Sequence, residues 1–410
     1  RLIYVILTIS VPRQSETTPK VMENIFAHIS GLYSNIDIYE KYWRGKQQRK
    51  VSFEIVSIGG FIQFVLWLQK KDRDMIEAAI YSQYPDVEIT EVADYAFEQI
   101  PSLWPNPKYE MFGGEFTLKK PAHLPIRTYL QFEHQPSEEY FKDPMSNLLE
   151  VLAAIRPEER LFFQVLVTPC NEDWKTKGEA EVNKMIGRKP KKKPSTMSMA
   201  TDMPVKILRE LGNAAFGHGG DEKKVEKKEE PWKMLNMTPG ERTVIEAVQM
   251  KLSKVGLRTK VRFVYLAPHN IFSTARFSSI KGCMYQYSAL NMNGFKSYRR
   301  TLPKKDYFWQ RWWKPRKQRK VCRNFRNRSN KGAPPFVLNI EELATIYHFP
   351  MMFVKAPLVK KTDAKRGEPP HSLPTQELKH VSAFRPVPPK PVALPSGEKK
   401  SGGAPPNLPV

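Results

Sequence analysis

The sequence has few of the features that usually indicate a redox, metal or membrane-spanning protein. Its three cysteines, Cys170, Cys283 and Cys322, match no disulfide framework, no C-x-x-C pair and no zinc-ligand spacing, which indicates a reducing compartment. The longest apolar runs, such as residues 4–9 and 61–68, fall far short of the roughly 18 residues that a membrane helix needs. No segment of this chain is therefore expected to span a bilayer.

Catalytic motifs are equally scarce. The eight histidines are scattered, no base stands next to Cys170, and neither G-x-S-x-G, H-E-x-x-H nor the phosphate-binding loop G-x-x-x-x-G-K-[ST] occurs. Paired carboxylates such as Glu138–Glu139 lie near element boundaries, where exposed charge that aids solubility is the ordinary explanation. We expect no enzyme activity, no cofactor and no metal site.

Acidic residues are scarce in the second part of the chain. Residues 1–187 carry 21 basic and 26 acidic side chains, a net charge of −5. The totals are 66 and 42, so residues 188–410 carry 45 basic and 16 acidic side chains, a net charge of +29. This asymmetry favours an anionic partner for the second part.

The first hundred residues alternate strand and helix patterns. Residues 3–11 alternate as a strand, and Thr18–Pro19 is typical of a helix start. Residues 51–68 form a hairpin pattern around Gly59–Gly60, and a helix from Asp72 to Tyr84 precedes a strand at 87–92. The order βαββαβ predicts an α+β protein with a ferredoxin-like domain at residues 1–100.

A second αβ domain is predicted in two pieces, residues 101–187 and 233–298. Its expected elements are strands at Glu115–Leu118, Ile126–Glu133, Leu161–Val167 and Val261–Leu266, a helix opened by Asp143–Pro144, and a helix capped by Thr238-Pro239-Gly240-Glu241. Because the last helix and strand echo residues 72–92, we hypothesise that this domain is a degenerate copy of the first. Residues 188–232, with basic and mixed-charge runs, are expected to be a mobile insertion.

Proline is concentrated at the end of the chain. Residues 357–410 hold twelve of the 35 prolines and few aromatic residues. The run 386–391, PVPPKP, favours extended polyproline geometry, so we expect a disordered tail that tethers a partner or binds a proline-reading one.

The strongest physical signal lies in the predicted unit 299–356. Residues 299–331 contain fourteen basic side chains and one acidic one, Asp306, with aromatic rings interleaved. The residues expected to bind nucleic acid or an anionic surface are Trp309, Arg311, Trp312, Trp313, Lys314, Arg316, Lys317, Arg319, Lys320, Arg323, Arg326 and Arg328. Phosphate neutralisation with base stacking and contact with lipid headgroups both remain open. The alternative is that the three tryptophans dock the helix on the core while its charges are merely solvated.

Residues 336–350, FVLNIEELATIYHFP, predict a short strand and a helix that stops at Pro350. Asn339 and Glu342 form its capping box. His348 is interpreted as a histidine at the helix C-terminus rather than a metal ligand, because no second ligand stands at metal spacing.

Three segments, 336–350, 365–374 (KRGEPPHSLP) and 403–409 (GAPPNLP), resemble an uncharacterised family of proteins from candidate-phyla bacteria. Within 336–350, Asn339, Glu341, Glu342 and His348 are the motif residues. The segment 11–20 is similar to the N-terminal region of type IV secretion and conjugative DNA-transfer ATPases. The resemblance covers residue 3 to about residue 374. It implies a P-loop ATPase partner and a membrane anchor outside this chain, but carries over no ATP hydrolysis and no catalytic residue.

These observations lead to one hypothesis with alternatives. The chain is interpreted as a non-catalytic accessory or scaffold of a membrane-associated, type IV secretion-like DNA-transfer apparatus, cytoplasmic and at the inner face of the membrane. Its basic part would contact nucleic-acid backbone or anionic lipid. The main alternative is a free-standing nucleic-acid-binding protein that reads no sequence, and the least favoured is an enzyme with an unrecognised site.

Overall fold

In a computed structural model, the first part of the chain forms the predicted strands and helices in the order βαββαβ, with one further short helix, α2, before the second strand. The elements are β1 (Tyr4–Ser10), α1 (Pro19–Ser30), α2 (Ile38–Tyr42), β2 (Val51–Ile58), β3 (Phe61–Gln69), η1 (Lys70–Asp72), α3 (Arg73–Gln83) and β4 (Glu88–Val92). The strands lie side by side in the order β4-β1-β3-β2, and each pair is antiparallel. The structure describes residues 2–11, 18–43, 45–132, 143–187, 237–304, 307–308 and 310–350.

The turn between β2 and β3 explains the sharp hairpin. Gly59 and Gly60 have φ values of 60° and 89°, in the left-handed region that glycine adopts most readily. A Cβ at Gly59 would also lie 2.8 Å from the carbonyl oxygen of Pro157. The hairpin therefore needs glycine there for both conformation and space.

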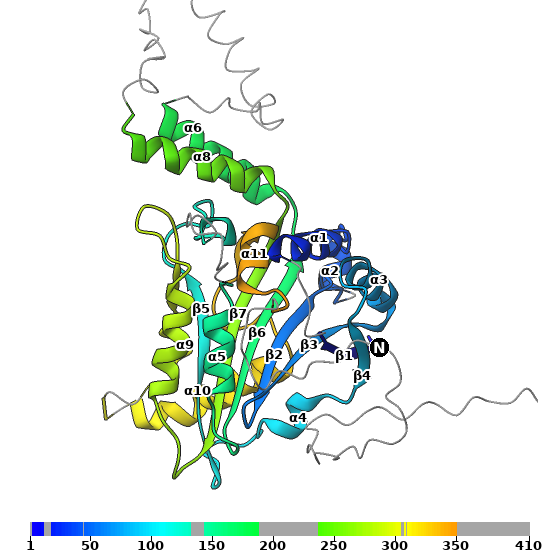
Figure 1. Cartoon of the computed structure of the whole chain (residues 1–410), viewed down its shortest axis with the longest axis vertical. Coiled ribbons are helices and arrows are strands. Elements are labelled where there is room, and N and C mark those ends of the chain that lie inside the picture. Colours follow the sequence, from blue (N-terminus) through cyan, green and yellow to red (C-terminus); the bar gives the residue numbers. More distant parts are fainter. Residues whose placement is uncertain are drawn as a thin grey trace, which may run out of the picture.

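The second part repeats this sequence of elements, and its strands are arranged in the reverse order across the sheet. Its elements are β5 (Tyr109–Leu118), η2 (Tyr129–Gln131), α5 (Ser146–Ala153), β6 (Arg160–Pro169), β7 (Gly256–Pro268), α9 (Ala275–Tyr285) and β8 (Phe295–Ser297). Their strands lie in the order β6-β7-β5-β8, and β6 pairs with β2, so both parts share one antiparallel sheet (Figure 1). A ninth strand, β9 (Phe336–Asn339), pairs antiparallel with the start of β7. The predicted α+β class is confirmed. By position in the sheet, β7 corresponds to β3 rather than to β4, which is not the pairing that the sequence echo suggested.

One predicted strand is wrong. The described residues of 126–133 form loop and the 3-10 turn η2 instead. The backbone N–H of Ile126 donates to Glu342 Oε1 at 2.8 Å, and that of Tyr129 donates to Thr345 Oγ1 at 2.9 Å. Side chains of a distant helix thus satisfy the backbone groups that a strand would pair with a neighbour.

Helices cover both faces of the sheet (Figure 1). Helices α1, α3, α5, α9 and α11 (Ile340–Ile346) contribute apolar side chains to one face. Helices α4 (Tyr95–Gln99) and α10 (Gln310–Arg326) pack on the other. Strand β7 is central to both layers, since Phe263 and Tyr265 face the first and Val264 and Leu266 face the second.

A helical arm is inserted between β6 and β7. It consists of α6 (Asp173–Ile186) and α8 (Pro239–Ser253), which pair with each other beyond one end of the sheet (Figure 1). Val182 and Ile186 pack against Val248 and Leu252. The capping box of Thr238 and Glu241 is confirmed. Helix α6 was not predicted, and the expected insertion 188–232 and tail 357–410 lie outside the described residues.

Candidate polyanion-binding surface on helix α10

The inner side of α10 holds the helix on the sheet. Its buried residues are Gln318, Val321, Cys322, Asn324 and Phe325, which recur at helical spacing. Phe325 lies 5.8 Å, centroid to centroid, from Phe162 on β6. This narrow apolar side fixes which residues of the helix face outward.

The outer side of α10 is basic and exposed. Arg311, Arg316, Arg319, Lys320 and Arg323 are all exposed there. The helix has eight basic residues and no acidic residue. Within the described part of the chain, Arg311, Arg316 and Arg323 have no carboxylate partner. Positions 316, 319 and 323 lie on successive turns, so their charges form a stripe along the helix.

Exposed aromatic rings gather at the N-terminal end of the same helix. Trp312 is 85% exposed and Trp313 is 55% exposed, beside Tyr307 and Phe308 at 57% and 78%. The guanidinium of Arg316 lies 5.0 Å from the Trp313 ring. These tryptophans do not dock the helix on the core, as one interpretation of the sequence held, because Val321, Cys322 and Phe325 do so. Trp309 lies outside the described residues.

Several of the basic residues predicted to bind an anion make contacts within the protein instead. Lys314 pairs with Glu110 at 2.6 Å, Lys317 Nζ donates to the carbonyl of Leu302 at 3.2 Å, and Arg319 Nε donates to that of Trp104 at 2.6 Å. The Arg326 guanidinium lies 4.5 Å from the Phe97 ring. These contacts use part of each side chain, and Arg319 remains exposed.

Arg328 does not share the outer surface. Its side chain is buried and pairs with Glu54 at 3.0 Å and with Asp94 at 2.5 Å. Burial alone lowers the pKa of Arg328, but the Glu54 and Asp94 charges outweigh it and raise that pKa above its ordinary value. Burial likewise raises the pKa of Glu54, and Arg328 with the Tyr95 hydroxyl lowers it below the usual value. Arg328 is therefore a structural cation.

Three further buried or half-buried cations hold the segment that follows α10. Lys260 Nζ donates to the carbonyls of Asn330, Lys331 and Ala333. Arg262 pairs with Glu115 and donates to the carbonyls of Asn324, Ser329 and Lys331. Lys50 Nζ donates to the carbonyl of Arg328 at 2.6 Å. Cations at the carbonyl-rich C-terminal end of a helix are favoured by its dipole.

Two of these lysines have strongly lowered pKa values. Burial, followed by the nearby charges of Arg262 and Arg328, lowers the pKa of Lys50 to about 8. Burial and the Arg262 charge lower the pKa of Lys260 to about 8, against the opposing effect of Glu115. The sequence did not single out Lys260 and Arg262, although charges alternating with apolar residues in a strand are a signal for a polar layer on one face.

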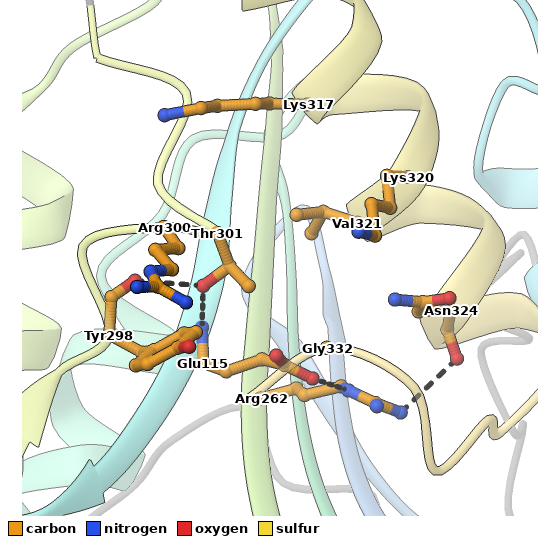
Figure 2. Close-up of a pocket in the computed structure, with 10 residues that line it drawn as sticks. All are labelled: Glu115, Arg262, Tyr298, Arg300, Thr301, Lys317, Lys320, Val321, Asn324 and Gly332. Atoms are coloured by element: carbon orange, nitrogen blue, oxygen red, sulfur yellow. Dashed lines mark hydrogen bonds and ion pairs between the residues drawn. The ribbon is translucent and has the colours of Figure 1, made fainter. Parts of the chain in front are cut away.

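A cavity of about 210 Å³ lies between α10, β7 and the loop that follows β8 (Figure 2). Arg262, Arg300, Lys317 and Lys320 contribute four cations to its lining. Glu115 is the lining carboxylate, and its oxygens accept from Arg262 and from the backbone N–H of Ala333. The cavity therefore joins the basic surface of α10 to the buried charges beneath it.

The motif residues at 339–348 clamp α11 to the body of the protein. Asn339 and Glu342 form the predicted capping box after β9 (Phe336–Asn339), and Glu342 also pairs with fully buried Lys251 at 2.8 Å. Glu341 pairs with Lys254 at 2.7 Å. His348 Nε2 lies 2.8 Å from Asp143 Oδ1. All four motif residues therefore have structural contacts, and the helix ends at Ile346, before the predicted stop at Pro350.

Nothing in the described part of the chain gathers three His, Cys, Asp or Glu side chains as a metal site would. The three cysteines are free thiols. Burial raises the pKa of Cys283 to about 11 and that of Cys322 to about 12, so neither is a ready nucleophile at neutral pH. Across the described residues, no helix is long and apolar enough to cross a membrane.

A family model matches residues 12–362, most of the chain. The chain belongs to the DUF8128 family, a domain of unknown function. The match covers the elements from α1 to α11 and leaves β1 outside. A comparison with curated proteins finds no match.

Proposed function

We propose that the chain is a non-catalytic module that binds the backbone of a single-stranded nucleic acid without reading its sequence. The observation that carries this proposal is the outer face of α10, where Arg311, Arg316 and Arg323 stand exposed beside Trp312 and Trp313. When guanidinium groups neutralise phosphates, counterions bound to the nucleic acid are released, which favours binding. Exposed indole rings provide stacking platforms that accept any base.

The electrostatics of α10 favour an external anion. A helix N-terminus carries partial positive charge, and the first turn of α10 has basic Arg311 and no acidic residue. The helix therefore repels its own cations at this end, whereas Arg323 and Arg326 in the last turn are favourably placed. A polyanion along the outer face would relieve this repulsion.

The packing of α10 favours a nucleic-acid strand over a membrane. An interfacial helix inserts an apolar face among the lipids. The apolar side of α10, formed by Val321, Cys322 and Phe325, is already buried on the sheet. Lipid binding would rest on headgroup charge and on the few exposed rings at one end of the helix, while a single strand can use both cations and rings along its length.

The wider biological role rests on resemblance. From segments 11–20 and 336–350 we propose an accessory or scaffold of a type IV secretion-like DNA-transfer apparatus, at the inner face of the membrane beside a P-loop ATPase. From the mirrored strand order we propose that the two parts are copies of a ferredoxin-like unit. The alternative is a free-standing nucleic-acid-binding protein. Gene neighbours that encode a P-loop ATPase and channel proteins would count against that alternative.

The decisive experiment measures binding of the purified chain to single-stranded DNA, duplex DNA and anionic liposomes across a salt series. We expect single-stranded DNA to bind most tightly, with an affinity that falls steeply as salt increases. A matched variant, Lys70→Ala/Lys71→Ala/Lys177→Ala, removes three exposed charges that belong to η1 and α6 rather than to α10, and should bind almost as the unchanged chain does.

Three results would contradict the proposal. Binding to liposomes alone would make α10 a membrane-surface anchor. Absence of binding to all three partners at low salt would leave a protein scaffold whose basic face meets an acidic protein. Equal weakening by the Lys70, Lys71 and Lys177 substitutions and by substitutions in α10 would show that net charge, not this surface, drives binding.

A further inference from the structure

The cavity beside α10 has an unusual balance of charge. Its lining includes four cationic side chains, Arg262, Arg300, Lys317 and Lys320, and the carboxylate of Glu115 (Figure 2). Glu115 is neutralised by Arg262 and also lies 3.5 Å from Lys260 Nζ. The cavity thus has an excess of positive charge that its own carboxylate does not balance.

Three of these cations have hydrogen-bond donors to spare. Arg300 and Lys320 are exposed, and neither pairs with another described residue. Lys317 Nζ has one acceptor, the carbonyl of Leu302, and an ammonium group has three donors. Arg262 differs, because its guanidinium already donates to Glu115, Gln164 and backbone carbonyls. Arg262 would therefore contribute positive charge below the ligand without contacting it directly.

Size and position limit the ligand. About 210 Å³ holds on the order of seven waters at roughly 30 Å³ each, which suits a phosphate group and its hydration. Lys320 also belongs to the outer face of α10, one turn from Arg316 and from Arg323. A strand that lies along this face can therefore place one end in the cavity.

We propose that this cavity binds a phosphomonoester, such as the terminal phosphate of a nucleic-acid strand, through Arg300, Lys317 and Lys320. A phosphomonoester carries nearly two negative charges and three acceptor oxygens at neutral pH. It matches three donor cations better than an internal phosphodiester, which carries one charge. This inference rests on the proposed function for the strand, but the small-anion site can be tested without it.

The test compares unlabelled oligonucleotides that carry a 5′-phosphate, a 3′-phosphate or neither as competitors for a labelled strand. The cavity variant is Arg300→Ala/Lys320→Ala, and both side chains are exposed, so folding should be preserved. The control is Arg311→Ala/Arg323→Ala, which removes the same charge outside the cavity lining. Thermal unfolding of each protein is also measured with inorganic phosphate and with sodium chloride at equal ionic strength.

We expect a preference of about tenfold for one phosphorylated end, because charge-assisted hydrogen bonds are strong. The cavity variant should lose the preference, while the control should bind every strand more weakly and keep it. If no strand binds but inorganic phosphate raises the Tm of the unchanged chain and not that of the cavity variant, the phosphate site stands and the proposed strand binding fails. If strands bind without end preference and phosphate acts as chloride does, the cavity proposal is wrong while strand binding stands.

Discussion

The two sides of one basic segment differ in what balances their charge. On the outer face of α10, Arg311, Arg316 and Arg323 point to solvent and have no carboxylate partner among the described residues. Just beyond the helix, Arg328 is buried and has two carboxylate partners, Glu54 and Asp94. Cations that are neighbours in sequence therefore have opposite roles, and only the outer ones are available to a ligand.

The buried and half-buried cations beneath α10 are called the inner cations here: Lys50, Lys260, Arg262 and Arg328. They also explain how a helix with eight basic residues is held in place. Lys50, Lys260 and Arg262 donate to the carbonyls of α10 and of the loop that follows it, where the helix dipole is negative. The outer charges repel one another without such compensation. The comparison predicts that substitutions of the inner cations change the stability of the fold. Substitutions of the exposed arginines of α10 should instead change the binding of nucleic acid.

The largest expected effect is on the inner side. Arg328→Met leaves the buried carboxylate of Glu54 without its main counter-charge, which should lower the free energy of unfolding by about 3–5 kcal/mol. Urea unfolding monitored by circular dichroism measures this. The exposed Arg323→Met should change stability by less than about 0.5 kcal/mol.

A double-mutant cycle tests whether the loss of stability in Arg328→Met comes from the unpaired charge of Glu54. Arg328→Met/Glu54→Gln removes both charges, so the two substitutions together should cost less than the sum of the single ones. Additive losses, or a loss below about 1 kcal/mol for Arg328→Met, would contradict the structural role of this pair.

The next effect concerns the outer face. Arg311→Ala/Arg316→Ala/Arg323→Ala should reduce the slope of log affinity against log salt by about 2, since each contact with a single strand contributes about 0.7. At 0.1 M salt the affinity should fall about a hundredfold, because a slope of 2 corresponds to a factor of about 100 per tenfold change in salt. Fluorescence anisotropy over a salt series measures both, and an unchanged slope would show that these arginines do not meet phosphates.

A smaller effect is expected from the rings. Trp312→Ala should weaken binding to single-stranded DNA about tenfold without changing the salt slope, because stacking contributes about 1–3 kcal/mol per base. Trp43 is 81% exposed on another part of the molecule, so Trp43→Ala serves as the matched control. Equal losses in the two variants would rule out a stacking role specific to α10.

Local patterns in the sequence predicted most of the elements. The hairpin at Gly59–Gly60 and the capping boxes at Thr238 and Asn339 depend on residues within a few positions, so they are readable without the fold. The alternating pattern of side chains at 126–133 predicted a strand. Such a pattern does not show which groups will accept hydrogen bonds from the backbone, and here they are side chains of α11. Helix α6 was missed because its narrow apolar side, Val182 and Ile186, needs α8 as a partner.

The candidate site was less predictable for the same reason. Charge density drew attention to the right segment, but it did not separate Arg323 from Arg328. That distinction depends on Glu54, which lies 274 positions away from Arg328 in the sequence. The cavity likewise combines Arg262, Arg300 and Lys320, which lie on three different elements.

The smallest expected effect is a pH dependence on the inner side. Burial and the charges of Arg262 and Arg328 lower the pKa of Lys50 from 10.5 to about 8 in the folded protein. Between these two pH values the unfolded chain keeps a proton that the folded protein has released, so Lys50 contributes stability that increases as the pH rises. From pH 7 to pH 9.5, the stability of the unchanged chain should rise by about 1 kcal/mol relative to Lys50→Met, after allowance for partial exposure. Urea unfolding at both pH values measures this difference. A stability difference between the two proteins that stays constant or shrinks would contradict this prediction. It would show that the hydrogen bond to the carbonyl of Arg328 keeps Lys50 protonated in the folded protein despite its burial.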